Sequence, residues 1–254
     1  MARLAIDDAA WTSRWRTRST GEKALLAGGL LGLAVAGPQP VAGACAAVAA
    51  VAAALLGARV VPGLLLRAAR APLVFVLVGL LGVVVSVGPA GAAAVWQWGP
   101  LWIAPESVTR GVEVLARSVG SVSALLLLTT TTPVPAVLEG LRRLRVPAVM
   151  VDIAGVVYRL LFLLLDTQSA IREAQAARLG YRDRASTYRS LGALGAAVLV
   201  RSLERARRLE DGLSGRGYDG SLVVVTTPVP ADRRFLAGTV VVLAALVALS
   251  VWSA

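Results

Sequence analysis

Residues 24–58 read ALLAGGLLGLAVAGPQPVAGACAAVAAVAAALLGA, a run without a single charged side chain. About 20 apolar residues in an α-helix cross the hydrocarbon core of a bilayer. The run is therefore long enough for two short crossings, and the Gly-Pro-Gln-Pro segment at 37–40 is typical of a turn between them. We expect membrane-spanning helices near 24–36 and 41–57. Because no small-residue cleavage site follows the first, we expect it to be retained rather than removed as a signal peptide.

The composition of the whole chain is that of a membrane protein. Hydrophobic residues make up 57% of the 254 residues, and the mean hydropathy is +0.72, both above the values of soluble domains. Three later segments predict one span each, near 72–89, 107–130 and 235–252. We therefore expect an all-α, polytopic membrane protein with about five transmembrane helices and additional amphipathic helices on the cytoplasmic side.

The distribution of charge predicts the orientation. The 26 basic residues outnumber the 15 acidic ones, which gives a net charge of +11. Basic residues precede the first predicted span and follow the second, whereas 37–40 and 89–105 contain none. Cytoplasmic loops of membrane proteins are enriched in Arg and Lys, so we expect a cytoplasmic N-terminus and a plasma (inner) membrane location. This rule explains the basic charge without invoking nucleic acid as a partner.

The segment 133–217 is the exception to the pattern of long apolar runs. Residues 146–165 are apolar enough to suggest a crossing, but a crossing there would place the Arg-rich segment 172–216 outside the cell. Polar residues at intervals of seven also mark one edge of this helix, at Asp152, Arg159 and Asp166. We therefore expect three regions: about four transmembrane helices in 1–130, cytoplasmic helices in 131–220 and a transmembrane helix in 221–254.

One predicted span carries charges at membrane depth. Arg110, Glu113 and Arg117 share one face of the helix predicted at 107–130. Charges inside a bilayer are costly unless they are paired or face protein. We expect Glu113 to lie between the two arginines and to face other helices. A shallow interfacial start of the helix is an open alternative.

Two helical stripes run through the basic segment. Steps of four and three residues define the first stripe, which consists of Leu160, Leu164, Thr167, Ile171 and Ala174 and ends at Arg178. The second has the same steps and consists of Leu199, Leu203, Ala206, Leu209 and Leu213, ending at Arg216. Pairs at i, i+4 support the second helix weakly, namely Glu204 with Arg208 and Arg207 with Asp211. The stripes are expected to pack against each other, against a partner or on anionic lipid.

Each stripe ends in an arginine beside glycine. The two ends read Ala177-Arg178-Leu179-Gly180 and Gly215-Arg216-Gly217. Glycine ends a helix by adopting the left-handed conformation, and an arginine there complements the helix dipole. Two copies on one basic segment favour a further role, because a guanidinium is a planar five-donor fork that fits a carboxylate-lined groove of another protein.

The chain resembles the transmembrane T component of energy-coupling factor transporters, in the CbiQ-like branch associated with cobalt uptake. The residues that carry the resemblance are Thr129–Pro133, Arg142–Pro147, Tyr158-Arg159, Ala177-Arg178, Arg201–Ala206 and Ser214–Gly220. It covers about 105–220 in sequence detail and the remainder by hydropathy. The motifs depart from the Ala-Arg-Gly of that family, since the first reads Ala-Arg-Leu with Gly180 one place late and the second reads Gly-Arg-Gly.

The resemblance implies a role in docking. In that family two such motifs end coupling helices that dock into two ATP-binding cassette ATPases, and a separate S-type membrane subunit binds the substrate. It assigns ATPase docking to Ala177, Arg178, Gly180, Gly215, Arg216 and Gly217. We further expect the two leucine-rich stripes to transmit the movement. The cargo implied is cobalt, with nickel, biotin or another vitamin left open.

Several chemistries are excluded by residues that the chain lacks. It has no His, a single Cys at position 45 and no Gly-x-x-x-x-Gly-Lys-Ser/Thr phosphate loop. We therefore expect no catalytic, metal or cofactor site in this chain, which is not an enzyme by itself, and ATP bound by partner subunits. The alternative function is a membrane scaffold without a transport role, whose basic amphipathic helices bind the inner leaflet.

Overall fold

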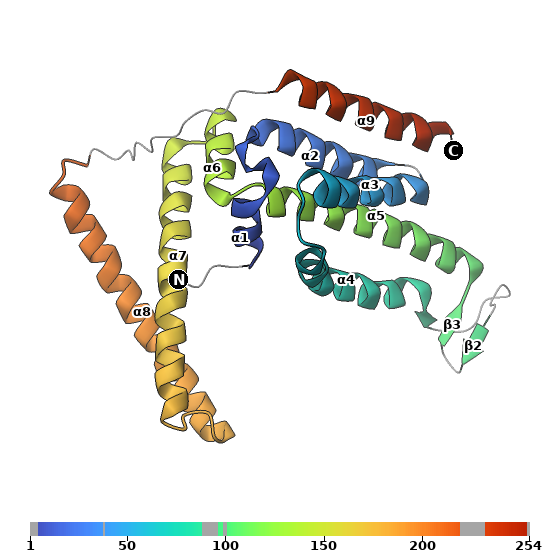
Figure 1. The fold of residues 1–254 in the computed structure, drawn as a ribbon. Helices are drawn as coiled ribbons and strands as arrows, with labels where there is room; N and C mark the ends of the chain where they lie inside the picture. Colours follow the sequence, from blue (N-terminus) through green and yellow to red (C-terminus); the bar gives the residue numbers. More distant parts are fainter. Residues whose placement is uncertain (1–4, 38, 88–95, 99–100, 219–231, 253–254) are drawn as a thin grey trace. The chain divides into compact units, whose positions relative to one another are not determined.

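The computed structural model describes residues 5–37, 39–87, 96–98, 101–218 and 232–252 (Figure 1). These residues form α-helices almost throughout, which confirms the all-α, polytopic fold. The chain divides into two compact units, one of 5–136 with 228–254 and the other of 1–4 with 137–227. The three sequence regions proposed above stay a prediction.

The first unit is a helical bundle. Its helices are α1 (Ala5–Thr12), α2 (Thr20–Ala36), α3 (Pro40–Ala52), α4 (Pro62–Val84), α5 (Pro105–Thr131) and α9 (Arg233–Trp252), with a 3-10 turn η1 (Arg14–Thr17) and a π-helical turn η2 (Ala53–Gly57). Three of these helices begin with proline, at positions 40, 62 and 105. Proline suits the first turn of a helix because the N–H that it lacks has no partner there.

A small antiparallel sheet precedes α5 in the chain and contains all the β-strands of the described residues. It consists of β1 (Ser86–Val87), β2 (Trp96–Trp98) and β3 (Leu101–Ile103), in the order β1-β3-β2. The helix predicted at 72–89 therefore ends at Val84, and residues 88 and 89 lie outside the described part.

The bundle is packed around close contacts between α3 and α5. Ala42, Ala46 and Ala50 are fully buried at every fourth position of α3. A Cβ at Gly43 would lie 2.5 Å from the carbonyl oxygen of Ala116, and a Cβ at Gly120 would lie 2.6 Å from that of Gly43. Small residues therefore let the two backbones approach closely, as in many membrane helix pairs.

Five described helical segments are long and apolar enough to cross a membrane: 40–57, α4, α5, α9 and α7 (Ala148–Ala177) of the second unit. Their number agrees with the expected five. Their membership differs, because α2 is only 17 residues long while the 30-residue α7 includes residues 148–165 of the apolar segment 146–165. That this segment stays on the cytoplasmic side remains a prediction.

Buried charges lie at the ends of the membrane helices. Lys23, in the first turn of α2, is 2% exposed, and its Nζ donates to the carbonyl oxygens of Trp15 at 3.2 Å and Thr131 at 3.1 Å. Thr131 is the last residue of α5, so the ammonium lies at a helix C-terminus, where the dipole favours a cation. The adjacent Glu22, also buried, accepts the backbone N–H of Asp232 at the start of α9. In the sequence, Lys23 is one of the basic residues before the first predicted span; in the structure it is buried within the first turn of α2.

Arg117 has a similar place within the bundle. Its guanidinium donates to the carbonyl oxygen of Gly37, at 3.4 Å, where α2 ends. Within the described residues Glu113 forms no ion pair with Arg110 or Arg117. The expected cluster of these three charges is therefore wrong: one N–H of Arg117 donates to the carbonyl oxygen of Gly37 at the end of α2 instead, and its Nε is buried without a partner among the described residues.

The second unit is built on a helical hairpin. It contains most of α6 (Val134–Arg143), all of α7 and α8 (Arg184–Ser214), and the turn at 178–183 that joins the last two. From this turn α7 and α8 run in opposite chain directions (Figure 1). Asp152 of the predicted polar edge is buried and forms an ion pair with Arg142 of α6, which joins α6 to α7.

We predict that Gly43→Ala destabilises the bundle by about 1–3 kcal/mol, because the added methyl meets backbone atoms that cannot move aside like a side chain. The midpoint of thermal unfolding in detergent is the measurement. Gly28→Ala is the matched control, since nothing lies within 4 Å of a Cβ at Gly28 of α2. Equal midpoints for the two variants would contradict the close contact of α3 and α5.

A second prediction concerns Lys23. Replacement by Met leaves the carbonyl oxygens of Trp15 and Thr131 without their buried donor, and we expect a loss of about 1–3 kcal/mol in the free energy of unfolding. Arg14→Met, which removes an exposed cation nearby, serves as the control. Thermal unfolding of both variants in the same detergent tests the prediction. Equal losses of stability in the two variants would contradict it, because the buried hydrogen bonds of Lys23 would then contribute nothing beyond the loss of a cation.

Candidate docking site at two arginine-tipped helix ends

The first arginine tip is the C-terminal end of α7. Arg178 follows the last helical residue, and Leu179 has a φ of 57°, in the left-handed region. The backbone N–H of Gly180 donates to the carbonyl oxygen of Gln175 at 2.8 Å, which closes the helix end. The expectation that glycine takes the left-handed position here is therefore wrong, because Leu179 does so one residue earlier.

Gly180 is required for a different reason. A Cβ at this position would lie 2.6 Å from Oγ of Ser190 and 2.8 Å from the carbonyl oxygen of Gln175. The turn can therefore approach α8 only with a residue that has no side chain. A glycine one place after the family position serves the contact between the two helices rather than the reversal of the backbone.

Three hydrogen bonds fix this turn. The Gln175 amide donates to the carbonyl oxygen of Ser190 at 3.0 Å, and the Ser190 hydroxyl donates to that of Gly180 at 2.8 Å. The Tyr181 hydroxyl donates to the side-chain oxygen of Gln175 at 2.7 Å. The backbone beside Arg178 is thus held from both helices, while the side chain of Arg178 is exposed.

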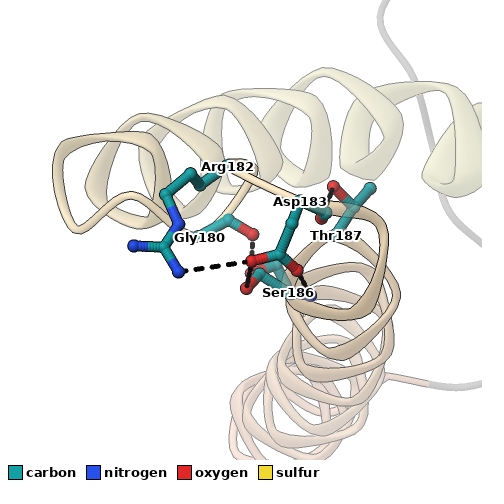
Figure 2. Close-up of polar contacts among 6 residues, drawn as sticks. Gly180, Arg182, Asp183, Ser186 and Thr187 are labelled. Carbon is teal, nitrogen blue, oxygen red and sulfur yellow. Dashed lines mark hydrogen bonds and ion pairs between the residues drawn. The ribbon is translucent and has the colours of Figure 1, made fainter.

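The start of α8 is capped by Asp183, as Figure 2 shows. Its carboxylate accepts hydrogen bonds from the backbone N–H of Ser186 at 2.8 Å and from the Ser186 hydroxyl at 3.1 Å. Nη2 of Arg182 lies 3.6 Å from Oδ2 of Asp183. The Thr187 hydroxyl donates to the backbone carbonyl of Asp183 at 2.8 Å. The pKa of Asp183 is lowered, chiefly because the Ser186 N–H stabilises the charged carboxylate.

The second arginine tip is the C-terminal end of α8, and it has the predicted form. Gly217 has a φ of 70°, and the N–H of Tyr218 donates to the carbonyl oxygen of Leu213 at 3.1 Å. Gly215 keeps helical dihedrals. The glycine stop predicted for this motif is therefore confirmed at Gly217, while residues 219 and 220 of the same motif lie outside the described part.

The two tips present charge without a counter-charge. Within the described part of the chain, neither Arg178 nor Arg216 forms an ion pair or a side-chain hydrogen bond, and both are exposed. Ala177, Gly215 and Gly217 are exposed beside them, and Gly180 is half-buried. Each tip is therefore a guanidinium on a fixed backbone, open to an acidic partner.

The leucine-rich stripes differ between the two helices. On α7 the stripe residues Leu160, Leu164 and Ile171 are half-buried. On α8 the stripe is open: Leu199 is 60% and Leu203 54% exposed, Leu209 is 38% exposed, and Leu213 is half-buried. Of the predicted i, i+4 pairs, Glu204 and Arg208 lie 3.8 Å apart, and Arg207 and Asp211 do not pair in the described structure. Packing within the hairpin therefore leaves much of the α8 stripe uncovered.

Comparison with known proteins shows the family to which this chain belongs. A family model described as a cobalt transport protein, CbiQ, matches residues 12–227. The chain belongs to the CbiQ family of cobalt transport proteins. It is 37% identical over 247 residues, 97% of each chain, to the cobalt transport protein CbiQ of Rhodobacter capsulatus. The resemblance noted from the sequence motifs is thereby confirmed.

Two further relatives extend the comparison. This chain is 33% identical to the cobalt transport protein CbiQ of Salmonella typhimurium over 156 residues, which are 59% of this chain and 68% of the relative. It is 27% identical over 180 residues to the energy-coupling factor transporter transmembrane protein EcfT of Limosilactobacillus fermentum, 65% of this chain and 66% of that one. The chain is accordingly a multi-pass membrane component of a cobalt or energy-coupling factor type of transporter.

The sequence pointed to the arginines but not to what positions them. Gln175, Ser190 and Tyr181 form the contacts of the turn, yet each is a common polar residue without a spacing that marks it. Asp183 did carry a signal, since an Asp directly before a helical segment is a preferred N-cap. Among the described residues no cluster of three His, Cys, Asp or Glu side chains could hold a metal ion.

We predict that Asp183→Ala speeds amide hydrogen exchange at Ser186 and Thr187, because the first turn of α8 loses its cap. Asp183→Asn is the control, since asparagine caps helices about as well. The lowered pKa adds a pH dependence: the stabilisation by the carboxylate is present above the unfolded-state pKa and is lost as pH falls through the folded-state value. Equal exchange in both variants would contradict the capping role.

Proposed function

We propose that this chain is the coupling subunit of an energy-coupling factor importer, which transmits movement of two ATP-binding cassette ATPases to a substrate-binding membrane subunit. The observation that carries the proposal is the pair of exposed arginines, 178 and 216, each on a hydrogen-bonded helix end and without an acidic partner in the described chain. The similarity to a transmembrane protein of an energy-coupling factor transporter supports it.

Docking follows from the chemistry of the tips. A guanidinium donates two parallel hydrogen bonds to a carboxylate, so each arginine fits an acidic groove on one ATPase. Each tip also offers an apolar or aromatic side chain beside the charge, with Leu179 67% exposed and Tyr218 44% exposed. A residue with left-handed backbone angles, Leu179 in one turn and Gly217 in the other, ends each helix next to its arginine.

Transmission depends on α8. This helix is continuous over 31 residues, which corresponds to a length of about 46 Å. It begins next to the turn that holds Arg178 and ends next to Arg216. The two docking points are therefore joined by one stiff element, and a closing movement of the ATPases displaces the hairpin rather than one tip alone. The exposed stripe of Leu199 and Leu203 on α8 is the surface that a membrane partner contacts, so the displacement of α8 is transmitted to that partner.

The remaining assignments come from the family and from the composition. ATP is bound by the partner ATPases, and this chain needs no cofactor. The cargo is cobalt, as the names of the relatives suggest, and it is recognised by the separate membrane subunit, since the chain has no His and only one Cys. The N-terminus and the hairpin of α7 and α8 face the cytoplasm, where ATP is available.

We predict that the double variant Arg178→Ala and Arg216→Ala no longer retains the ATPases. Removing one partner of a buried charge pair costs on the order of 2–5 kcal/mol, because the other charge stays unpaired. Co-purification of the ATPases with the full-length chain in detergent is the measurement. Replacement of both residues by Lys is expected to weaken retention as well, since an ammonium cannot reproduce the two-pronged contact.

The control for this experiment is Arg201→Ala with Arg207→Ala, which removes two exposed charges from the middle of α8. This variant is expected to retain the ATPases at the wild-type level. Normal co-purification with the double tip variant would overturn the proposal. If no ATPase binds the wild-type chain and the protein associates only with anionic lipid in a salt-sensitive way, the scaffold alternative would be favoured instead.

A further inference from the structure

A groove of about 500 Å³ lies between α7 and α8, on residues that do not belong to the turn at 178–183. Its apolar wall comes from both helices and includes Leu160, Leu163 and Leu209. Its charged wall consists of four arginines, Arg159 of α7 with Arg205, Arg208 and Arg216 of α8 or its end. The volume is that of a site for a small ligand, and no acidic residue is among the described ones that line it.

The charge of this groove is not balanced within the described chain. Arg159 and Arg205 form no ion pair or side-chain hydrogen bond there, nor does Arg216. Arg208 lies 3.8 Å from Glu204, but both side chains are more than half exposed, and such a pair contributes little. Several guanidinium groups around one cavity repel each other, so the groove favours an anion.

The surface beside the groove is apolar and uncovered in this unit. On α7, Met150, Ile153 and Val157 are about 60% exposed, and Leu161 is 40% exposed. These residues recur at steps of three and four and so form one stripe along the helix. The stripe borders the leucine wall at Leu160, but it lies on the other side of α7 from Arg159, which is two residues from both Val157 and Leu161. Within the groove itself, an amphiphile with an anionic head and hydrocarbon tails matches the arginines and the leucine wall.

We propose that this groove binds one anionic phospholipid, with its phosphate on Arg159 and Arg205 and its acyl chains along Leu160, Leu163 and Leu209. The chain is a membrane protein, so such lipids are available to it, and basic pockets on the cytoplasmic side of membrane proteins commonly take lipid head groups. Arg216, which is assigned to ATPase docking, also lines the groove, but the proposed phosphate ligands Arg159 and Arg205 are not at the helix tips.

The experiment is native mass spectrometry of the full-length protein in detergent, with phosphatidylglycerol and phosphatidylcholine added in equal amounts. The wild type is expected to retain one phosphatidylglycerol in preference to phosphatidylcholine. The variant Arg159→Gln with Arg205→Gln is expected to lose that preference by on the order of tenfold. The control, Arg201→Gln with Arg207→Gln, removes the same charge from α8 outside the groove and is expected to keep it.

Three outcomes would overturn the proposal. Equal retention by the groove variant and its control would show a diffuse attraction to surface charge. Equal competition by soluble glycerol 3-phosphate would show a phosphate site without a role for the apolar wall. Displacement of the lipid when the ATPases bind the full-length chain would show that the groove is a protein-docking face. Weakened ATPase binding by the single variant Arg178→Ala, whose side chain does not line the groove, with unchanged lipid retention would separate this site from the docking function.

Discussion

The membrane bundle depends on how buried charges meet the ends of its helices. The last carbonyl groups of a helix have no partner within that helix, so an end that is buried needs a partner from elsewhere in the protein. Lys23 fills that need for α5 and links it to η1 through Trp15, while the neighbouring Glu22 accepts an N–H at the start of α9. Two adjacent residues of α2 thereby join three other elements, with the sign of charge that each helix dipole favours.

Two buried threonines near the end of α5 satisfy their own hydroxyl groups within the helix. The hydroxyls of Thr130 and Thr131 donate to carbonyl oxygens one turn earlier, at 2.6 Å each, so neither buried group lacks a partner. The run of threonines that marked the family in the sequence is thus part of the helix end that Lys23 covers. Arg117 repeats the arrangement for α2, where its guanidinium lies against the carbonyl group of Gly37.

Much of the fold could be predicted because apolar runs and prolines act locally. Uncharged length predicts helices, and a proline at position 40, 62 or 105 marks where one begins. The roles of charges could not be predicted in the same way, since a lysine before an apolar run looks alike whether it is solvated or covers a helix end. For the same reason the sequence predicts a pairing of Arg117 with Glu113, whereas in the structure Arg117 donates to the carbonyl oxygen of Gly37 at a helix end. At the docking site the arginines could be found, but the left-handed Leu179 could not, because the contact of Gly180 with Ser190 comes from a distant helix.

The unbroken course of α8 has a consequence for how such a protein can vary. Each residue added to or removed from a helix rotates everything beyond it by about 100° and shifts it by 1.5 Å. A one-residue deletion within 184–214 would therefore turn the Arg216 end away from its original direction while leaving the Arg178 end in place. The number of residues in α8 therefore fixes the rotation of the Arg216 end about the helix axis relative to the Arg178 end.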